Sequence, residues 1–350
     1  MLERSSKLGN VDRRMHMYRE VTEKSRLLDG RGYLEAKGFA RKMNFIYNRE
    51  QVRSFPLKLK EWNFYQFIKD HYALQMTIGH VSYMCSVSVS LINLDTGKRY
   101  DFGTMKAGYI PKLDLDPEKE SFVSFRDKDF YMSFQVKADR RILCARGSNK
   151  QFKNVDIRLI IENDVDNEKM VIATPFKKPG QFYLNYKENY YLGKGSVRFD
   201  DFQMDFSGCS GLIDWGRGVW PYSHEWFWGN LTSHIQGVPF GFNIGWGFGD
   251  LQYATENVYF YNKKAYKVGE LSVERDEQDY MKPWKLWDAE GKIRLEFIPY
   301  YDNYTENKYV VVDTHCHQLY GFYSGSVQTE DGVKEFSNIL AFVEHAVNKW

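Results

Sequence analysis

The sequence predicts an all-β protein that consists of two tandem antiparallel β-barrels or strongly curved sheets. Apolar and polar residues alternate in short segments along most of the chain, which is the pattern of half-buried strands. Turn signals such as the Asp-Thr-Gly at 95–97 separate these segments, and helical patterns are few, as in sandwiches and barrels. The chain has 350 residues, whereas a typical domain has roughly 150, so we expect two domains.

The expected order begins with a polar arm of mixed charge at 1–24, followed by a first β domain at 25–193 and a second at 194–350. Strand patterns of the first domain lie at 58–67, 83–94, 130–137, 155–161, 170–174 and 181–186. Those of the second domain lie at 196–206, 258–261, 266–274, 293–298, 308–312, 315–327 and 338–347. The last segment also fits an amphipathic helix, but we favour a closing strand because two sets of residues alternate along 339–344.

Composition narrows the class of function. The 48 basic and 46 acidic residues nearly balance, so the chain has no general attraction to nucleic acid or to an anionic membrane. The charged N-terminus lacks the apolar core of a signal peptide, and no apolar run approaches the roughly 20 residues that span a bilayer. The four cysteines lie far apart without zinc-type spacing, which favours a reduced, cytoplasmic protein.

Most of the candidate chemistry lies in the run 211–257, which contains five of the nine tryptophans and many glycines. Glycines this frequent among aromatic strand residues indicate sharp bends or close approach of another group. A few polar groups among aromatic walls are typical of a pocket for a small, mostly apolar molecule. The alternative is that the run forms a tightly packed β core. The chain contains no GxSxG elbow, no P-loop and no strand–GxGxxG–helix motif.

Three groups within this run are candidates. Arg217 lies three residues after Asp214 across a glycine-rich bend, so it could pair with that carboxylate, tune it as an acid or bind an anionic ligand group. Tyr222 and His224 share one face of a strand with Trp226 and could act in acid–base chemistry, although surface positions would look the same. Glu256 and Asn257 could orient a hydroxyl or a water, or they could cap the preceding turn.

A fourth candidate lies outside the run, in the segment His315-Cys316-His317-Gln318. Period two places both histidines on one face of a strand, where they could bind a metal with Glu344 or His345 as a third ligand. A histidine pair without a fixed third ligand is usually not a metal site. We therefore favour His317 and Gln318 as polar groups in a pocket and predict no metal.

These residues also carry a resemblance that extends from about 27 to 350. The chain resembles the DUF2804 domain family of bacterial proteins of unknown function. The matching pieces are LLDGRGYL (27–34), GFAR (38–41), YNR (47–49), LKEWNFY (59–65), ATPF (173–176), DWGRGVWPY (214–222), GFNIGWGFGD (241–250), ATEN (254–257), HQLYGFYSG (317–325) and AFVEH (341–345). The chain departs from the family at Asn63, where an acidic residue is common, and at Ala341, where glycine is common.

More distantly, the family is similar to lipocalin-like proteins with two tandem β-barrels, which include carotenoid 1,2-hydratases and tocopherol cyclases. This resemblance implies an aromatic-walled pocket, a carboxylic acid that protonates a double bond, tryptophans that stabilise the resulting cation, and no organic cofactor. The residues expected to act in catalysis are Asp214, Glu256, Tyr222 and His317. Those expected to bind the ligand are Trp215, Arg217, Trp226, Trp228, Asn243, Asn257 and Gln318.

The sequence therefore predicts a cytoplasmic protein that binds a hydrophobic, isoprenoid- or lipid-like molecule, with cofactor-free hydration, dehydration, isomerisation or cyclisation as the candidate chemistry. One alternative is a carrier or sensor that binds a lipophilic ligand without changing it. Another is a carbohydrate-binding or carbohydrate-acting β protein, which would need paired carboxylates roughly 5 to 10 Å apart in one cleft.

Overall fold

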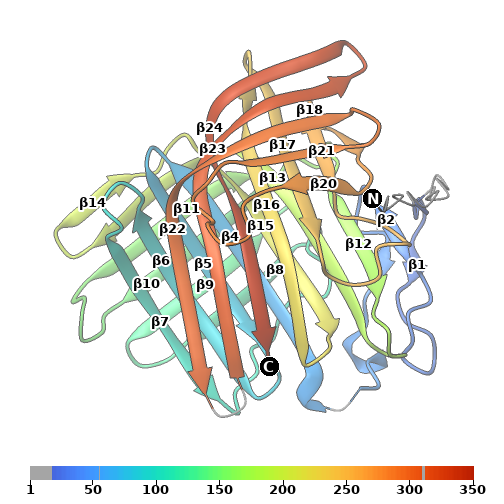
Figure 1. Ribbon diagram of the computed structural model, residues 1–350. Helices are drawn as coiled ribbons and strands as arrows, with labels where there is room; N and C mark the ends of the chain where they lie inside the picture. The colour runs from blue at the N-terminus through green and yellow to red at the C-terminus, as the bar shows by residue number, and fades with distance from the viewer. Residues whose placement is uncertain (1–17, 55, 310–311) are drawn as a thin grey trace, which may run out of the picture.

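The fold is all-β and consists of two large, curled antiparallel sheets (Figure 1), as the sequence predicts. The computed structural model describes residues 18–54, 56–309 and 312–350. Within these residues the only helices are two short 3-10 turns, η1 (Arg49–Gln51) and η2 (Pro56–Lys58). No helix in the described ranges has the length and apolarity needed to cross a lipid bilayer.

The first sheet follows the strand order β7-β6-β5-β4-β15-β13-β11-β10-β9-β8. Its strands are β4 (Leu59–Lys69), β5 (Tyr72–His80), β6 (Met84–Asn93), β7 (Arg99–Ala107), β8 (Ser121–Arg126), β9 (Phe130–Val136), β10 (Arg140–Gly147), β11 (Val155–Glu162), β13 (Phe182–Phe199) and β15 (Cys209–Val219). The short strands β2 (Gly38–Ala40), β12 (Met170–Pro175) and β14 (Phe202–Asp205) extend it, and β1 (Ser25–Arg26) pairs separately with β3 (Phe45–Ile46).

The second sheet follows the order β19-β18-β17-β16-β24-β23-β22-β21-β20. Its strands are β16 (Ser223–Ile235), β17 (Val238–Trp246), β18 (Val258–Tyr261), β19 (Lys264–Lys267), β20 (Leu271–Glu274), β21 (Trp284–Asp288), β22 (Ile293–Tyr309), β23 (Val312–Thr329) and β24 (Gly332–Lys349). The segment 338–347 lies within β24, so the preference for a closing strand over a helix is confirmed. The segment 308–312 lies where β22 ends and β23 begins, and residues 310–311 fall outside the described part.

The chain passes from the first sheet to the second between Val219 and Ser223. The boundary expected at 193–194 lies inside β13, which continues through both positions and is followed by β15 in the same sheet. Residues 1–17 of the expected polar arm lie outside the described ranges. From Val21, whose amide donates to the carbonyl of Phe39, the chain runs beside β2.

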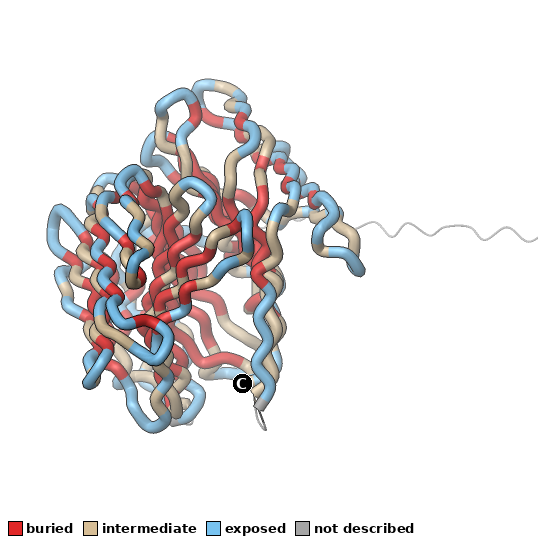
Figure 2. Tube along the Cα trace, turned by 90° about the vertical axis from the view of Figure 1, so that its left-hand side faces the viewer, coloured by how far each residue is buried: buried red, intermediate tan, exposed pale blue. Residues whose placement is uncertain are grey.

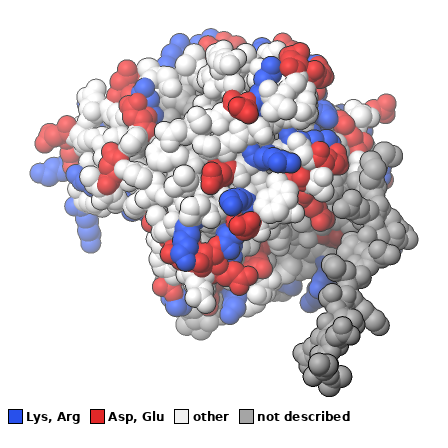
Figure 3. All heavy atoms as spheres, turned by 45° about the horizontal axis from the view of Figure 1, so that its top comes forward, with Lys and Arg blue, Asp and Glu red and all other residues white. Residues whose placement is uncertain are grey.

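Alternation along the strands creates a separate interior for each sheet and an interface between the sheets. The largest apolar cluster fills the curl of the first sheet, and a second cluster fills the curl of the second. A third cluster joins Ala73, Ile92 and Leu212 of the first sheet to Tyr320 and Phe342 of the second. The buried stretches accordingly run through the middle of the molecule and the exposed ones lie at the loops (Figure 2). Acidic and basic side chains are interspersed over the face shown in Figure 3.

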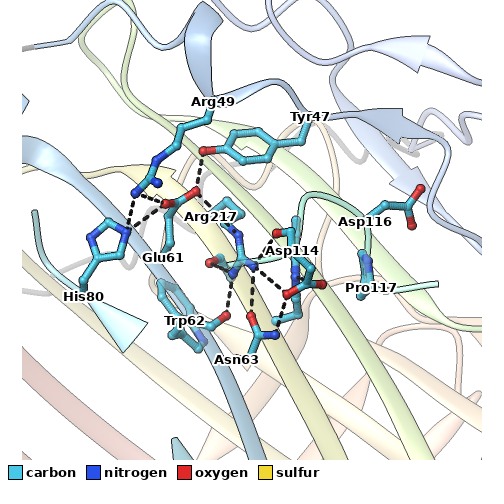
Figure 4. Close-up of polar contacts among 12 residues, drawn as sticks. Tyr47, Arg49, Glu61, Trp62, Asn63, His80, Asp114, Asp116, Pro117 and Arg217 are labelled. Atoms are coloured by element: carbon cyan, nitrogen blue, oxygen red, sulfur yellow. Dashed lines mark hydrogen bonds and ion pairs between the residues drawn. The ribbon is translucent and has the colours of Figure 1, made fainter. Parts of the chain in front are cut away.

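The fully buried guanidinium of Arg217 connects β15 to β4 and to the loop that carries Asp114 (Figure 4). Arg217 lies 3.6 Å from Glu61 and 3.4 Å from Asp114, and it donates to the Asn63 side chain at 2.9 Å. The expected pairing with Asp214 does not occur. Residues 214 and 217 are an odd number of positions apart on one strand, so their side chains project from opposite faces of the sheet.

The carboxylate of Glu61 binds the remaining residues of this network. Its carboxylate accepts hydrogen bonds from Tyr47 at 2.7 Å and His80 at 2.8 Å, and it pairs with Arg49 at 2.6 Å. Burial by itself raises the pKa of Glu61, but the His80 hydrogen bond and the charges of Arg217 and Arg49 lower it to about 2. The carboxylate is therefore ionised throughout the physiological pH range.

Replacing Arg217 by Met should lower the free energy of unfolding by about 3–5 kcal/mol, because it leaves Asp114 and Glu61 without their shared buried cation. Urea-induced unfolding measures this loss. Arg198→Met is the matched control, since the pair of Arg198 with Asp156 is solvent-exposed, and it should cost far less. Equal losses in the two variants would contradict the role given to Arg217.

Candidate functional site

A cavity of about 420 Å³ lies between the two sheets. Side chains of β4, β5, β13 and β15 line it from the first sheet, and side chains of β16, β22, β23 and β24 line it from the second. Its lining includes eight aromatic side chains, among them Trp62, Tyr183, Trp220, Trp226, Trp228 and Phe248, together with polar and charged residues. Its size and apolar walls are those of a site for a small organic molecule.

Side chains alternate between the two faces of a strand, and this alternation explains which residues of the first sheet line the cavity. Tyr183 and Lys187 lie an even number of residues apart on β13, and Asp214 lies opposite Lys187 on β15. On β4, Trp62 lies opposite Gly216, and a Cβ at position 216 would come within 1.9 Å of the Trp62 indole. A glycine at this position is therefore required for Trp62 to lie flat on the strand and form the cavity wall.

The ammonium of Lys187 joins carboxylates from the two sheets. Its Nζ lies 3.4 Å from Oδ1 of Asp214 on β15 and 3.5 Å from Oε2 of Glu256, which precedes β18 of the second sheet. The same ammonium lies 3.7 Å from the centroid of the Trp228 ring, a cation–π contact. Lys187 is 2% exposed, so these partners replace water almost completely.

Glu256 is held in place by residues of β17. Asn243 donates its amide to Oε2 of Glu256 at 3.0 Å and accepts a hydrogen bond from the Trp228 indole at 2.7 Å. A Cβ on Gly245 would come within 2.3 Å of the Glu256 carboxylate, so the glycine provides the space that this side chain occupies. Asn243 therefore positions both a carboxylate and a wall of the cavity.

Glu344 of β24 adds a further carboxyl group to the cavity, and within the described residues it has no ion pair closer than 4 Å. It accepts hydrogen bonds from the Trp226 indole at 2.8 Å and from the Gln318 amide at 3.2 Å. Burial raises the pKa of Glu344 to about 7, which outweighs the lowering effects of the Trp226 hydrogen bond and of the charge on Lys187. A carboxyl group with this pKa can both donate and accept a proton near neutral pH.

The structure brings five of the predicted site residues to the cavity and gives a sixth a supporting place. Asp214, Glu256, Trp226, Trp228 and Gln318 line the cavity, and Asn243 holds Glu256. Glu256 and Asp214 meet at one ammonium although they are far apart in the sequence.

The remaining predicted residues lie elsewhere. Trp215 and Arg217 project into the interior of the first sheet, where the Trp215 indole donates to Asp114 at 3.0 Å. Tyr222 is 58% exposed and does not line the cavity. Asn257 stabilises the loop before β18. Its side chain accepts a hydrogen bond from the Gly245 amide at 2.7 Å and donates one to the Gly269 carbonyl at 2.8 Å.

Neither His317 nor His224 lines the cavity. His317 lies on the opposite face of β23 from Gln318, 2.7 Å from Asp302 and stacked on Tyr280. His224 faces the Pro221 carbonyl through Nδ1 at 2.9 Å, and burial lowers its pKa to about 4. In the described ranges no three His, Cys, Asp or Glu side chains are grouped closely enough to hold a metal ion.

Sequence reasoning missed Lys187 and considered Glu344 only as a metal ligand. Both had a detectable pattern. Lys187 alternates with Asn185 and Asn189 along an otherwise aromatic stretch, which places polar groups on one face of a strand. Glu344 belongs to the same alternating set as Leu340 and Phe342, and a lone acid on an apolar face indicates a buried carboxyl group.

The fold and the cavity together define an all-β protein of two curled antiparallel sheets with an aromatic-lined cavity between them. The chain belongs to the DUF2804 family, a domain family of unknown function whose model matches residues 18–350. No curated protein matches the sequence. Among solved structures, kievitone hydratase from Nectria haematococca is 11% identical, with a TM-score of 0.47 over 94% of this chain and 98% of that one. An AttH-like protein from Nitrosomonas europaea is 10% identical, with a TM-score of 0.44 over 85% of this chain and 98% of that one.

Replacing Lys187 by Met should destabilise the fold by about 3–5 kcal/mol at pH 8, because Asp214 and Glu256 then lose their buried cation. The loss should shrink at pH 4, since the unpaired carboxylates can take up protons. Urea-induced unfolding at both pH values measures this. The triple variant Lys187→Met/Asp214→Asn/Glu256→Gln is the control and should recover most of the lost stability at pH 8. A loss in the single variant that is unaffected by pH and by the added substitutions would contradict the assigned pairing.

The raised pKa of Glu344 predicts a pH-dependent contribution to stability. The folded pKa of about 7 exceeds the ordinary value of 4.5, so the folded state binds this proton more tightly than the unfolded chain. The contribution is fully present below pH 4.5 and is lost as pH rises through 7, by up to about 3 kcal/mol. The difference in unfolding free energy between wild type and Glu344→Gln, measured from pH 4 to 8, should show this slope. Glu335→Gln, at an exposed position of the same strand, should not.

Proposed function

We propose that the cavity binds a hydrophobic, isoprenoid- or lipid-like small molecule and that Glu344 exchanges a proton with it in cofactor-free acid–base chemistry. Hydration, dehydration, isomerisation and cyclisation of a double bond belong to this class. The observation that carries the proposal is a buried carboxyl group with a pKa of about 7 in a cavity whose lining includes several tryptophan and phenylalanine rings.

The aromatic walls support a hydrophobic class of ligand. Eight aromatic side chains line a space of about 420 Å³. Polar groups lie around Lys187 and Glu344 and also at other points of the lining, such as Gln75, Arg99 and Asn303. The aromatic part of this surface binds apolar bodies through buried area, and its few convergent polar groups orient them.

The polar cluster supports a division of roles among the three carboxyl groups. Glu344, in its protonated form, donates to a carbon of the double bond, and the positive charge that develops lies near the rings of Trp226 and Trp228. Asp214 or Glu256 then accepts a proton, from an attacking water in a hydration or from the neighbouring carbon in an isomerisation. Lys187 positions these two carboxylates relative to Glu344.

The four cysteines are free thiols in the structure. This state fits the cytoplasmic location that we propose for the protein.

Solvent deuterium gives a direct test of proton transfer. The protein is purified with its endogenous ligand, and the ligand is extracted, identified by mass spectrometry and returned to apo-protein in D₂O. Wild type should incorporate deuterium at carbon or form a product. Glu344→Gln should do so at least about 100-fold more slowly, because it removes the general acid, while it still binds the ligand.

Lys334→Gln, a partly exposed position on the same strand, is the matched control and should react like wild type. An unaltered ligand without deuterium after incubation with wild type would instead indicate a carrier. Full activity in Glu344→Gln would overturn the role given to Glu344, and full activity in both Asp214→Asn and Glu256→Gln would exclude these two as proton acceptors.

A further inference from the structure

Lys60 is a buried cation without a counter-charge. Three lysines are buried in the described part of the chain, and two of them have a carboxylate within 4 Å: Lys187 near Asp214 at 3.4 Å, and Lys169 near Glu188 at 3.7 Å. Lys60, 2% exposed, has no such carboxylate and no hydrogen-bond acceptor among the described residues. Its ammonium lies against an aromatic face, 4.8 Å from the centroid of the Trp350 ring. A largely buried ammonium without a counter-charge lacks part of the stabilisation that water provides.

Lys60 projects toward the cavity side of the first sheet. It lies opposite Gly218 on β15, and paired residues of antiparallel strands share a face, as Trp62 and Gly216 do two positions away. A Cβ on Gly218 would come within 2.5 Å of Nε1 of Trp220, so the indole of Trp220 lies over the glycine that faces Lys60. Trp220 and Trp350 both line the cavity. The ammonium therefore lies next to Trp350, one of the residues that line the cavity.

The side chains around Lys60 have unused hydrogen-bonding groups. The indole nitrogens of Trp220 and Trp350 are buried and donate to no described atom. Nε2 of His224 is also buried without a partner, but it is an acceptor, because Nδ1 carries the hydrogen that is donated to Pro221. The three rings form one cluster, with centroids 5.2 to 5.6 Å apart. Buried N–H groups without acceptors are rare in native proteins, and each one calls for a partner that occupies the space.

The charges of neighbouring residues also favour an anion at this position. Glu61, next in sequence, projects to the other face, where Arg49 and Arg217 hold it. Burial, together with the nearby charge of Lys58, lowers the pKa of Lys60 to about 8, and no neighbouring carboxylate acts against this effect. An anion beside Lys60 would supply the missing charge and accept hydrogen bonds from the indoles.

We propose that the ligand is an amphipathic acid whose carboxylate lies against Lys60, Trp220 and Trp350, and whose hydrocarbon body extends along the aromatic cavity toward Glu344. The inference rests on the proposed ligand-binding role of the cavity and is independent of proton transfer. Trp226 connects the two ends: its indole donates to Glu344 at 2.8 Å, and its ring stacks on His224 with centroids 5.7 Å apart. The reacting part of the ligand and its acidic end are thus separated by one tryptophan side chain.

The test compares dodecanoate with dodecan-1-ol, which share a chain and differ in the head group, by titration of tryptophan fluorescence in the wild-type protein. Dodecanoate should bind at least about tenfold more tightly, because hydrogen bonds to charged groups are the stronger ones. Lys60→Met should remove this preference by weakening dodecanoate at least about tenfold, and should leave dodecan-1-ol within about twofold of wild type. Lys58→Met, an exposed position two residues earlier, removes the same charge and should keep the preference.

Urea-induced unfolding of the apo-protein separates this role from a structural one. Lys60→Met should be at least as stable as wild type, because it removes an unpaired buried charge. A loss of stability with an unchanged preference for dodecanoate would show that Lys60 serves the fold alone and would overturn the inference. Inorganic phosphate that displaces dodecanoate at equal concentration would assign the site to a free anion instead.

Equal binding of both probes would overturn the acid-binding inference and leave the hydrophobic cavity intact. Failure of both probes to bind would overturn the proposed function of the cavity together with the inference.

Discussion

The site depends on one buried ammonium shared by two carboxylates that come from different sheets. Lys187 and Asp214 belong to the first sheet, whereas Glu256 reaches them from the second. Removing three charged groups from water is costly, and the cost is offset only when the geometry is close and the remaining hydrogen-bonding groups are satisfied. The ion cluster therefore links the two sheets at the cavity, and among the described residues it leaves Glu344 without an ion pair.

The glycines of the run 211–257 serve mainly for close approach. Gly216 and Gly245 lie in extended strands, and a side chain at either position would collide with Trp62 or with Glu256, respectively. Removing the Cβ allows a large or charged side chain to lie directly on the backbone of the neighbouring strand. The aromatic wall and the acidic group are thus both specified by residues that have no side chain of their own.

The fold could be predicted from sequence because alternation with period two survives in nearly every strand, including β24, where a helix was the alternative. The site could be predicted only in part. Asp214, Glu256, Trp226 and Trp228 were recognisable because they lie in one unusual run. Lys187 and Glu344 act through partners that lie far away in sequence, so their roles follow from strand pairing and burial. Trp215 and Arg217 show the opposite case. They share the run with Asp214, but because side chains alternate along the strand, theirs project into the interior of the first sheet and not into the cavity.

The two faces of β15 contribute to different parts of the molecule. Asp214 serves the cavity between the sheets, while Trp215 and Arg217 help to fill and cross-link the interior of the first sheet. A substitution on this strand is therefore constrained by two environments at once.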